Sequence, residues 1–129
     1  MIAVDTNILV RLLVADDPEQ HELAKRFFDT RLSVKAPGYL TMLVLAETHW
    51  TLTRAYGFSA DEVRAVLLAV INSAQILVER AELARKALAN PSVDFADQLI
   101  HLCGQEAGCT TTVTFDRRFA KMAGVELLG

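Results

Sequence analysis

The sequence predicts an α/β fold in which helices cover both faces of a parallel sheet. Short segments rich in β-branched residues alternate along the chain with longer segments that carry apolar residues at helical spacing. This alternation is typical of strand–helix–strand units, whose strands run parallel and are buried. The chain has 129 residues, of which 52% are hydrophobic, and this suits one compact domain over residues 1–129.

The predicted strands are segments that are too brief for helices and are bounded by turn residues. The second is closed by Pro37 and Gly38, and the fourth is a run of threonine and valine. In chain order, the strands comprise residues 2–5, 33–36, 75–78, 110–114 and 125–128.

The predicted helices begin and end at recognisable signals. The run Asp16-Asp17-Pro18 supplies a cap and a first-turn proline, and Ser59 with Glu62 forms a capping box. Gly57 ends one helix, because glycine readily adopts the left-handed conformation of a helix stop. In chain order, the helices comprise residues 7–15, 18–30, 39–56, 59–71, 79–89, 94–107 and 117–123.

Four carboxylates occupy places where a charge needs a partner. Asp5 and Asp116 come directly after predicted strands, Asp97 lies in the first turn of an apolar helix, and Glu47 interrupts the apolar residues 43–46. A buried, unpaired carboxylate is costly, so such acids are usually paired, protonated or bound to a cation. Ligands of parallel sheets bind at the carboxyl ends of the strands, so the four acids together suggest a shared cation.

Each acid also has a structural interpretation. Asp5 is a candidate cap for the helix that follows it, and Asp94 has the N-cap of its helix as its first role and a ligand role as its second. Asp116 suits a turn in which it pairs with Arg117 or Arg118. The joint pattern, rather than any single acid, favours a functional site.

Glu47 is the hardest of the four to explain structurally. It shares one helical stripe with Leu40, Leu43, Trp50 and Arg54. Arg54 is two turns away and is not an obvious ion-pair partner. The stripe therefore favours a working group at Glu47.

Oxygen ligands alone are hard donors, which suit Mg²⁺ or Mn²⁺ better than zinc. The three histidines, His21, His49 and His101, show no mutual metal-ligand spacing. Mg²⁺ held by a few carboxylates keeps several waters and leaves positions open to phosphate oxygens. The pattern therefore predicts phosphodiester hydrolysis, and the chain contains no competing nucleophile or phosphate-loop motif.

The net charge of −3 does not decide the partner. The acids of the candidate site account for more than this charge, so the rest of the chain is net positive and bound cations would offset the cluster. Basic residues recur near the predicted site, notably Arg11, and those singled out as RNA-contact candidates are Arg54, Arg117, Arg118 and Lys121.

The sequence predicts a cytoplasmic protein with no membrane segment. No apolar run approaches the roughly 18 residues that span a bilayer, and no basic segment precedes an apolar one at the N-terminus. Cys103 and Cys109 match neither a redox pair nor a zinc knuckle. They are expected to be free and mostly buried thiols.

Four segments in order resemble the acidic motifs of the PIN-domain family. They are VDTNILV at residues 4–10, LAETHWTL at 45–52, DFADQLI at 94–100 and TVTFD at 112–116. The motifs cover essentially the whole chain, and with its small size they resemble the VapC-type branch of bacterial toxin–antitoxin systems. Gln98-Leu99 departs from the usual small residues, which is expected to alter helix packing more than chemistry.

The resemblance implies an α/β/α sandwich of three layers, with parallel strands in the order 3-2-1-4-5, acting as a Mg²⁺- or Mn²⁺-dependent endoribonuclease. Asp5 and Asp97 would be the principal metal ligands. Glu47 would orient or activate the attacking water, and Asp116 would complete the metal site directly or through water.

The resemblance also implies residues and partners around this centre. Asn7 and Thr114 would contribute hydrogen bonds, and Asp94 belongs to a motif variant that would support a second metal. The family implies a homodimer and a cognate antitoxin whose tail covers the active site.

Two other classes stay open. A non-catalytic member of the PIN fold would bind RNA or a protein partner. A receiver-like phosphotransfer domain is a weaker alternative, because its first strand carries an acidic pair and here that strand offers only Asp5.

Overall fold

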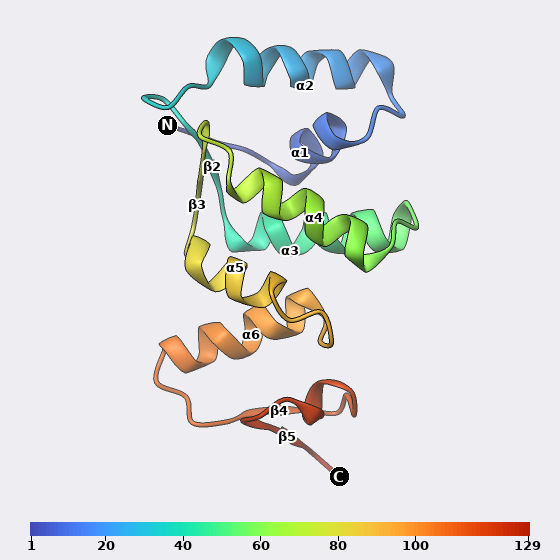
Figure 1. Ribbon diagram of the computed structural model, residues 1–129, viewed down its shortest axis with the longest axis vertical. Helices are drawn as coiled ribbons and strands as arrows, with labels where there is room; N and C mark the ends of the chain where they lie inside the picture. Colours follow the sequence, from blue (N-terminus) through green and yellow to red (C-terminus); the bar gives the residue numbers. More distant parts are fainter. The chain divides into compact units, whose positions relative to one another are not determined.

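Five short strands form two parallel sheets in the computed structural model, which describes residues 1–129 (Figure 1). The chain divides into two compact units, Met1–Ala81 (unit 1) and Glu82–Gly129 (unit 2). Helices alternate with the strands in both units. Parallel strands joined by helices confirm the predicted α/β class.

The sheet of unit 1 is built around its second strand. β2 (Gly38–Leu40) pairs in parallel with β1 (Ile2–Ala3) on one side and with β3 (Ile76–Val78) on the other. Gly38 and Tyr39 are the register positions that pair with residues of both neighbours. This arrangement agrees with the 3-2-1 part of the predicted strand order.

The second strand lies further along the chain than predicted. Residues 33–36 form a tight turn, in which Ser33 N donates to Ala36 O and Ala36 N donates to Ser33 Oγ, both at 3.1 Å. Gly38 opens the strand because the packing there is very close, and a Cβ atom would lie 2.9 Å from Leu32 Cδ1. Pro37 and Gly38 therefore start this strand and do not close it.

Four α-helices complete unit 1, and one continues into a π-helix. They are α1 (Thr6–Leu13), α2 (Pro18–Arg31), α3 (Met42–Trp50) followed by the π-helix η1 (Thr51–Ala55), and α4 (Ala60–Ile71). The predicted capping box of Ser59 and Glu62 is present. The helix predicted from residue 39 begins only at Met42, because Thr41 caps it by accepting a hydrogen bond from Val44 N at 3.2 Å.

Unit 2 combines two helices with a pair of strands. α5 (Ala81–Leu88) begins at the unit boundary, and α6 (Phe95–Glu106) precedes β4 (Thr112–Thr114), the 3₁₀-helix η2 (Phe119–Lys121) and β5 (Val125–Leu127). β4 and β5 pair in parallel, in agreement with the 4-5 part of the predicted order. A pairing of the first strand with the fourth, and with it the three-layer sandwich, stays a prediction.

Gln98 ties the two helices of unit 2 together. Its side chain is 2% exposed, and its amide Nε2 lies within hydrogen-bond distance of three carbonyls, those of Ala87 at 3.0 Å, Asn90 at 2.7 Å and Val93 at 3.0 Å. These carbonyls end α5 and line the loop that follows. The departure from the usual motif at this position therefore serves packing, as expected from the sequence.

The two cysteines differ from expectation in one respect. Neither Cys103 nor Cys109 forms a disulfide, as predicted, but both are exposed. The inward face of α6 is taken by Phe95, Leu99 and Leu102, which leaves Cys103 on the outer face. None of the helices has both the length and the apolar content that crossing a membrane would need.

Candidate functional site

Three of the predicted site residues line one pocket of unit 1. Asp5, Asn7 and Glu47 lie on the wall of a pocket of about 380 Å³. The loop after β1 and the start of α1 supply the first two, and α3 supplies the third. The remaining lining residues are Thr6, Val10, Arg11, Thr51 and Tyr56.

Asp5 is both a cap and a wall of this pocket. Its backbone is extended and its Oδ1 accepts a hydrogen bond from Thr6 N at 2.7 Å, so it is the N-cap of α1. The carboxylate is nevertheless exposed and lines the pocket. The structural interpretation from the sequence is correct and leaves the second oxygen available to a ligand.

Glu47 is oriented by a hydroxyl group from a distant part of the chain. Thr6 Oγ1 donates to Glu47 Oε1 at 2.8 Å, across a separation of 41 positions. Thr6 is not among the site residues predicted from the sequence, and its place between Asp5 and Asn7 in the first acidic motif is the signal that could have found it. This hydrogen bond holds Oε1 of Glu47 in place, and it thereby also fixes the direction in which Oε2 points.

The setting of Glu47 corrects an expectation. Glu47 was expected to occupy a place in an apolar run where a charge needs a partner. Instead Glu47 and Arg54 are exposed, and Leu43 and Trp50 of the same stripe are 69% and 62% exposed. The buried face of α3 is formed instead by Val44, Leu45, Thr48 and His49. Glu47 is accessible to a ligand because it points away from the core.

The π-helix brings two further side chains to the pocket. Tyr56 N donates to Thr51 O at 3.2 Å, a bond that spans five residues, so this turn is one residue wider than an α-helical turn. Thr51 and Tyr56 both line the pocket with Glu47. The sequence predicted a continuous α-helix here, because no residue type or spacing in residues 51–55 indicates the wider turn.

In unit 2, Asp97 lies among other carboxylates. Asp94 caps α6, as predicted, with Oδ2 accepting from Ala96 N at 3.2 Å and Asp97 N at 3.4 Å. Burial raises the pKa of Asp97, and the charges of Asp94 and Asp116 raise it further. The three predicted acids of this unit are therefore close enough to repel one another.

Asp116 shapes the turn after β4. Its Oδ1 accepts hydrogen bonds from Arg118 N at 2.8 Å and Phe119 N at 3.1 Å, while Thr114 Oγ1 accepts one from Asp116 N at 3.0 Å. The predicted turn role is thus correct, but Asp116 bonds to backbone amides and makes no ion pair with an arginine side chain. Thr114 holds the turn and leaves Asp116 Oδ2 free of these contacts.

The donor set fits a hard divalent cation. Arg11–Asp16 and Arg64–Asp61 are ion pairs of unit 1, and neither involves a predicted site acid. Within either unit no three His, Cys, Asp or Glu side chains are arranged to hold a metal. Mg²⁺ is commonly held through one or two carboxylates with several waters, so accessible, mutually repelling carboxylates suit it without such a trio.

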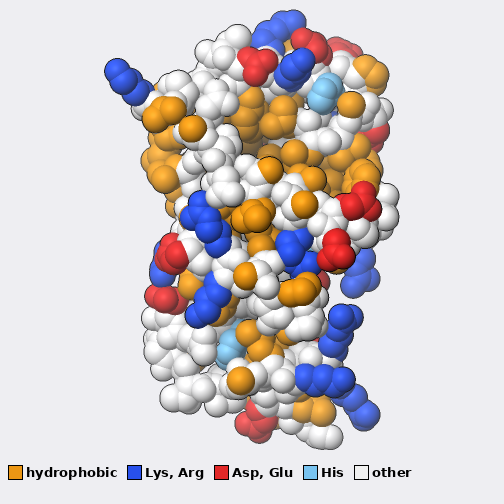
Figure 2. Space-filling view, in the orientation of Figure 1, with side chains coloured by type: hydrophobic (Ala, Val, Ile, Leu, Met, Phe, Trp, Pro, Cys, Tyr) orange, Lys and Arg blue, Asp and Glu red, His pale blue; other side chains and the backbone are white.

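Two of the predicted RNA contacts lie in a basic groove of unit 2. Arg118 and Lys121 line a groove of about 700 Å³ together with Lys86, and no acidic side chain lines it. Figure 2 shows lysine and arginine side chains projecting along one side of this unit. Arg117 and Arg54 are exposed and do not line this groove, and Arg54 belongs to η1 in unit 1.

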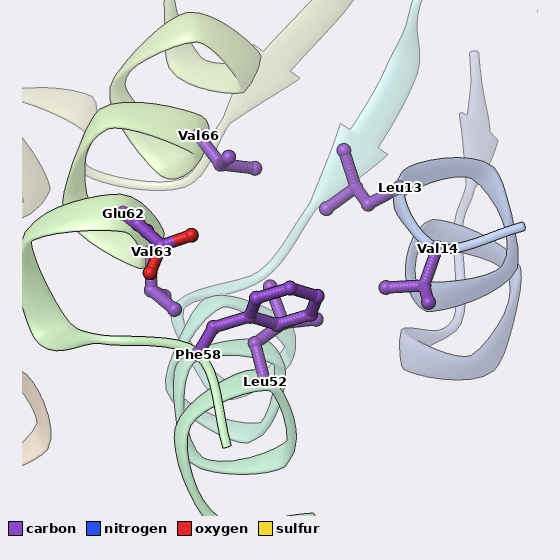
Figure 3. A pocket seen from close by; sticks show the side chains of 7 residues that line it. All are labelled: Leu13, Val14, Leu52, Phe58, Glu62, Val63 and Val66. Atoms are coloured by element: carbon purple, nitrogen blue, oxygen red, sulfur yellow. The ribbon is translucent and has the colours of Figure 1, made fainter. Parts of the chain in front are cut away.

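A second pocket of unit 1 has a different chemistry. It measures about 140 Å³ and is walled by Leu13 and Val14 on one side and by residues of α4 on the other, with Phe58 between them (Figure 3). Its one carboxylate, Glu62, accepts a hydrogen bond from Ser59 N at 3.3 Å within the capping box. All its other lining side chains are apolar, so the polar groups of this pocket are limited to one carboxylate that takes part in a helix cap.

In a comparison with known protein families, residues 2–125, nearly the whole chain, match the PIN domain. Among solved structures, the crystal structure of Mycobacterium tuberculosis VapC20, a Sarcin-Ricin loop cleaving toxin, is 28% identical to this chain, covers 100% of both chains and has a TM-score of 0.47. Curated proteins give no significant match. Because the PIN match leaves out only a few residues at either end, the chain belongs to the PIN-domain family.

Proposed function

We propose that this protein is a Mg²⁺- or Mn²⁺-dependent endoribonuclease of the VapC toxin type. The observation that carries the proposal is the setting of Asp97: burial raises the pKa of its carboxyl group, the charges of Asp94 and Asp116 raise it further, and none of the three acids belongs to the Arg11–Asp16 or Arg64–Asp61 ion pair. In a PIN-family chain, a bound divalent cation would relieve this repulsion. The four ordered acidic motifs support the VapC-type assignment.

The chain's own residues divide the work between them. Asp5 and Asp97 are the proposed principal ligands, and Asp116 completes the site with the oxygen that its turn leaves free. When bound, the cation would supply positive charge to phosphate oxygens and would lower the pKa of water. Glu47, held through one oxygen by Thr6, orients the attacking water with the other.

Three residues support these groups. Asn7 lines the unit 1 pocket beside Asp5 and would hydrogen-bond to substrate or to ordered water. Thr114 holds the turn that carries Asp116. Asp94 keeps α6 capped and adds negative charge near Asp97, which would support a second metal.

RNA is the proposed substrate because a local basic surface is available on a chain of negative net charge. Arg118 and Lys121 line the basic groove and suit successive phosphates, while Arg117 and Arg54 add exposed positive charge. The resemblance to VapC-type toxins adds a cognate antitoxin, a homodimer and a cytoplasmic site of action to the proposal.

The test is cleavage of single-stranded RNA oligonucleotides and total RNA by purified protein with Mg²⁺, with Mn²⁺ and with EDTA. Cleavage should stop with EDTA and return with Mn²⁺, and an Asp97→Asn preparation made in parallel should be inactive. Cleavage that survives EDTA in the wild type and in Asp97→Asn alike would overturn the metal mechanism. Metal-dependent RNA binding with no cleavage of any RNA would favour the non-catalytic PIN module instead.

A further inference from the structure

Arg11 is the one basic side chain that lines the same pocket as Asp5 and Glu47. It belongs to the last turn of α1, and its side chain is 30% exposed. An acidic pocket by itself repels a phosphodiester, so a cation fixed in its wall changes what the pocket can bind. The position of Arg11 therefore raises two questions: which groups hold its guanidinium group, and which ligand that group could bind.

The guanidinium group is held by side chains from three different segments. Arg11 Nε donates to Gln20 Oε1 at 2.7 Å, and Nη1 donates to Asp16 Oδ1 at 3.0 Å and approaches Tyr56 Oη at 3.4 Å. These partners come from α2, from the loop before it and from the end of the π-helix. Nε and Nη1 are thereby engaged, and the second terminal nitrogen, Nη2, is left for a ligand.

Tyr56 closes this network on Asp16. Its hydroxyl donates to Asp16 Oδ2 at 2.9 Å. This hydrogen bond is the main cause of the lowered pKa of Asp16 and of the raised pKa of Tyr56. At neutral pH the carboxylate is therefore charged and the phenol keeps its proton, so both groups hold Arg11 in one orientation.

The aromatic ring of Tyr56 is itself fixed from behind. It stacks on Phe58 with ring centroids 6.2 Å apart and an angle of 19° between the planes. Phe58 in turn belongs to the apolar pocket of Figure 3. A chain of contacts thus runs from the apolar interior of unit 1 to the guanidinium group.

A purely structural ion pair would need only Arg11 and Asp16. Here a carboxylate, an amide and a phenol converge on one partly exposed guanidinium group in a pocket wall. Fixing a long side chain before binding lowers the entropy lost when a ligand binds. Arginine presents a planar fork of donors that matches phosphate oxygens, and this use requires a fixed plane.

We propose that Arg11 binds a backbone phosphate of the RNA strand in the unit 1 pocket, and that Asp16, Gln20 and Tyr56 are the residues that position it. The inference rests on the proposed function and deepens it by assigning a substrate contact that none of the acidic motifs contains. Arg11 contacts the substrate, whereas its three partners act only through Arg11.

The first experiment measures binding and not cleavage. Each variant is made on the Asp97→Asn background, and a fluorescent single-stranded RNA is titrated in EDTA over a series of salt concentrations. Arg11→Gln should weaken binding by about tenfold and flatten the slope of log affinity against log salt by about 0.7 units, the value for one lost contact with a single strand. Arg26→Gln, an exposed arginine of α2 outside the pocket, is the matched control and should change neither quantity.

Arg11→Lys separates charge from geometry. Lysine keeps the charge but loses the planar fork, so binding should weaken while the salt slope stays at the wild-type value. Tyr56→Phe, made in the wild-type background, removes the hydroxyl that fixes Asp16 and should raise KM for RNA cleavage several-fold with little change in kcat. A purely structural role predicts lower melting temperatures in these variants with unchanged RNA affinity per folded molecule, and that result would overturn the inference.

The outcomes also separate this inference from the proposed function. If the wild type cleaves RNA with metal but Arg11→Gln keeps its affinity and salt slope, the phosphate contact is wrong and the nuclease stands. If no RNA is cleaved under any condition but Arg11→Gln still flattens the slope, the nuclease is wrong and the contact stands. Should Arg11→Gln fail to fold, Arg11→Lys with an unchanged affinity overturns the contact.

Discussion

The two units differ in how they treat their acidic residues. In unit 1, Asp5 caps a helix, Glu47 accepts a hydrogen bond from Thr6, and Arg11 adds a positive charge to the same pocket. In unit 2, burial raises the pKa of Asp97, and the neighbouring carboxylates of Asp94 and Asp116 raise it further. Asp5 and Glu47 are thus oriented by protein donors, as are Asp94 and Asp116 of unit 2, whereas Asp97 is repelled by its neighbours and is left in need of a cation.

This difference shows which carboxylates a metal ion affects most. A group that is already held by protein donors gains orientation from the protein, and a cation adds less to it. A group whose neighbours repel it gains the full attraction of a cation, because binding replaces repulsion. We therefore expect the residues of unit 2 to dominate metal affinity, and those of unit 1 to dominate the placement of water and phosphate.

The largest effect should be on metal affinity. Asp97→Asn should weaken Mn²⁺ binding by about 100-fold or more and abolish cleavage, since it removes a direct ligand from a small set. Asp94→Asn is the matched control in the same turn, and it should change affinity by less than about tenfold because asparagine caps a helix nearly as well as aspartate. Calorimetric titration with Mn²⁺ measures both.

Asp5→Asn sharpens the same comparison from the side of unit 1. It should also abolish cleavage, and a loss of Mn²⁺ affinity smaller than that of Asp97→Asn is expected. If Asp94→Asn weakened Mn²⁺ binding as much as Asp97→Asn does, Asp94 would instead be a metal ligand. An Asp97→Asn protein that binds Mn²⁺ like the wild type would break the comparison.

A smaller effect is expected where the protein orients its own carboxylate. Thr6→Val removes the donor to Glu47 and should lower kcat by about 10- to 100-fold, the usual range for a group that orients a working residue. KM and Mn²⁺ affinity should change little. Thr6→Ser keeps the hydroxyl and should restore kcat, whereas a valine variant with wild-type kcat would show that Glu47 needs no orientation.

The smallest effect concerns stability without metal. Because the pKa of Asp97 is raised above 3.8, its ordinary value, the folded protein holds this proton more tightly than the unfolded chain does. Ionisation of Asp97 therefore costs nothing below 3.8, and it lowers stability as the pH rises from there through the raised pKa. Asparagine has no proton to lose, so the free energy of unfolding of Asp97→Asn should exceed that of the wild type across this pH range.

Thermal melting in EDTA, in buffers from below 3.8 to neutral, measures this gain. The two proteins should melt together in acid, and the variant should melt slightly higher at neutral pH. A variant that melts lower at neutral pH would show that the carboxylate of Asp97 stabilises the fold, as a helix cap does.

The features that the sequence predicts well are those with local causes. The cap at Asp94 and the capping box at Ser59 depend on residues within one turn, and both are present. The alternation of strands and helices likewise gives the α/β class. Motif order then identifies the acids, since it needs no knowledge of the contacts between them.

The features that the sequence does not predict depend on distant partners. The second strand was misplaced because Gly38 is required by contacts with Leu32 and Val4, which lie in other segments. Thr6 bonds to a residue 41 positions away, and Arg11 bonds to Tyr56 at a separation of 45. Propensity and spacing carry no information about such pairs.

The π-helix at Thr51–Ala55 has a consequence for chain length. An α-helix keeps residues four apart on one face, whereas here Thr51 and Tyr56 are five apart and line the same pocket. The segment therefore behaves as an α-helix that has gained one residue. Deleting Thr53 should let the turn tighten and still present the tyrosine to the pocket, and relatives that are one residue shorter should align with their gap at this turn.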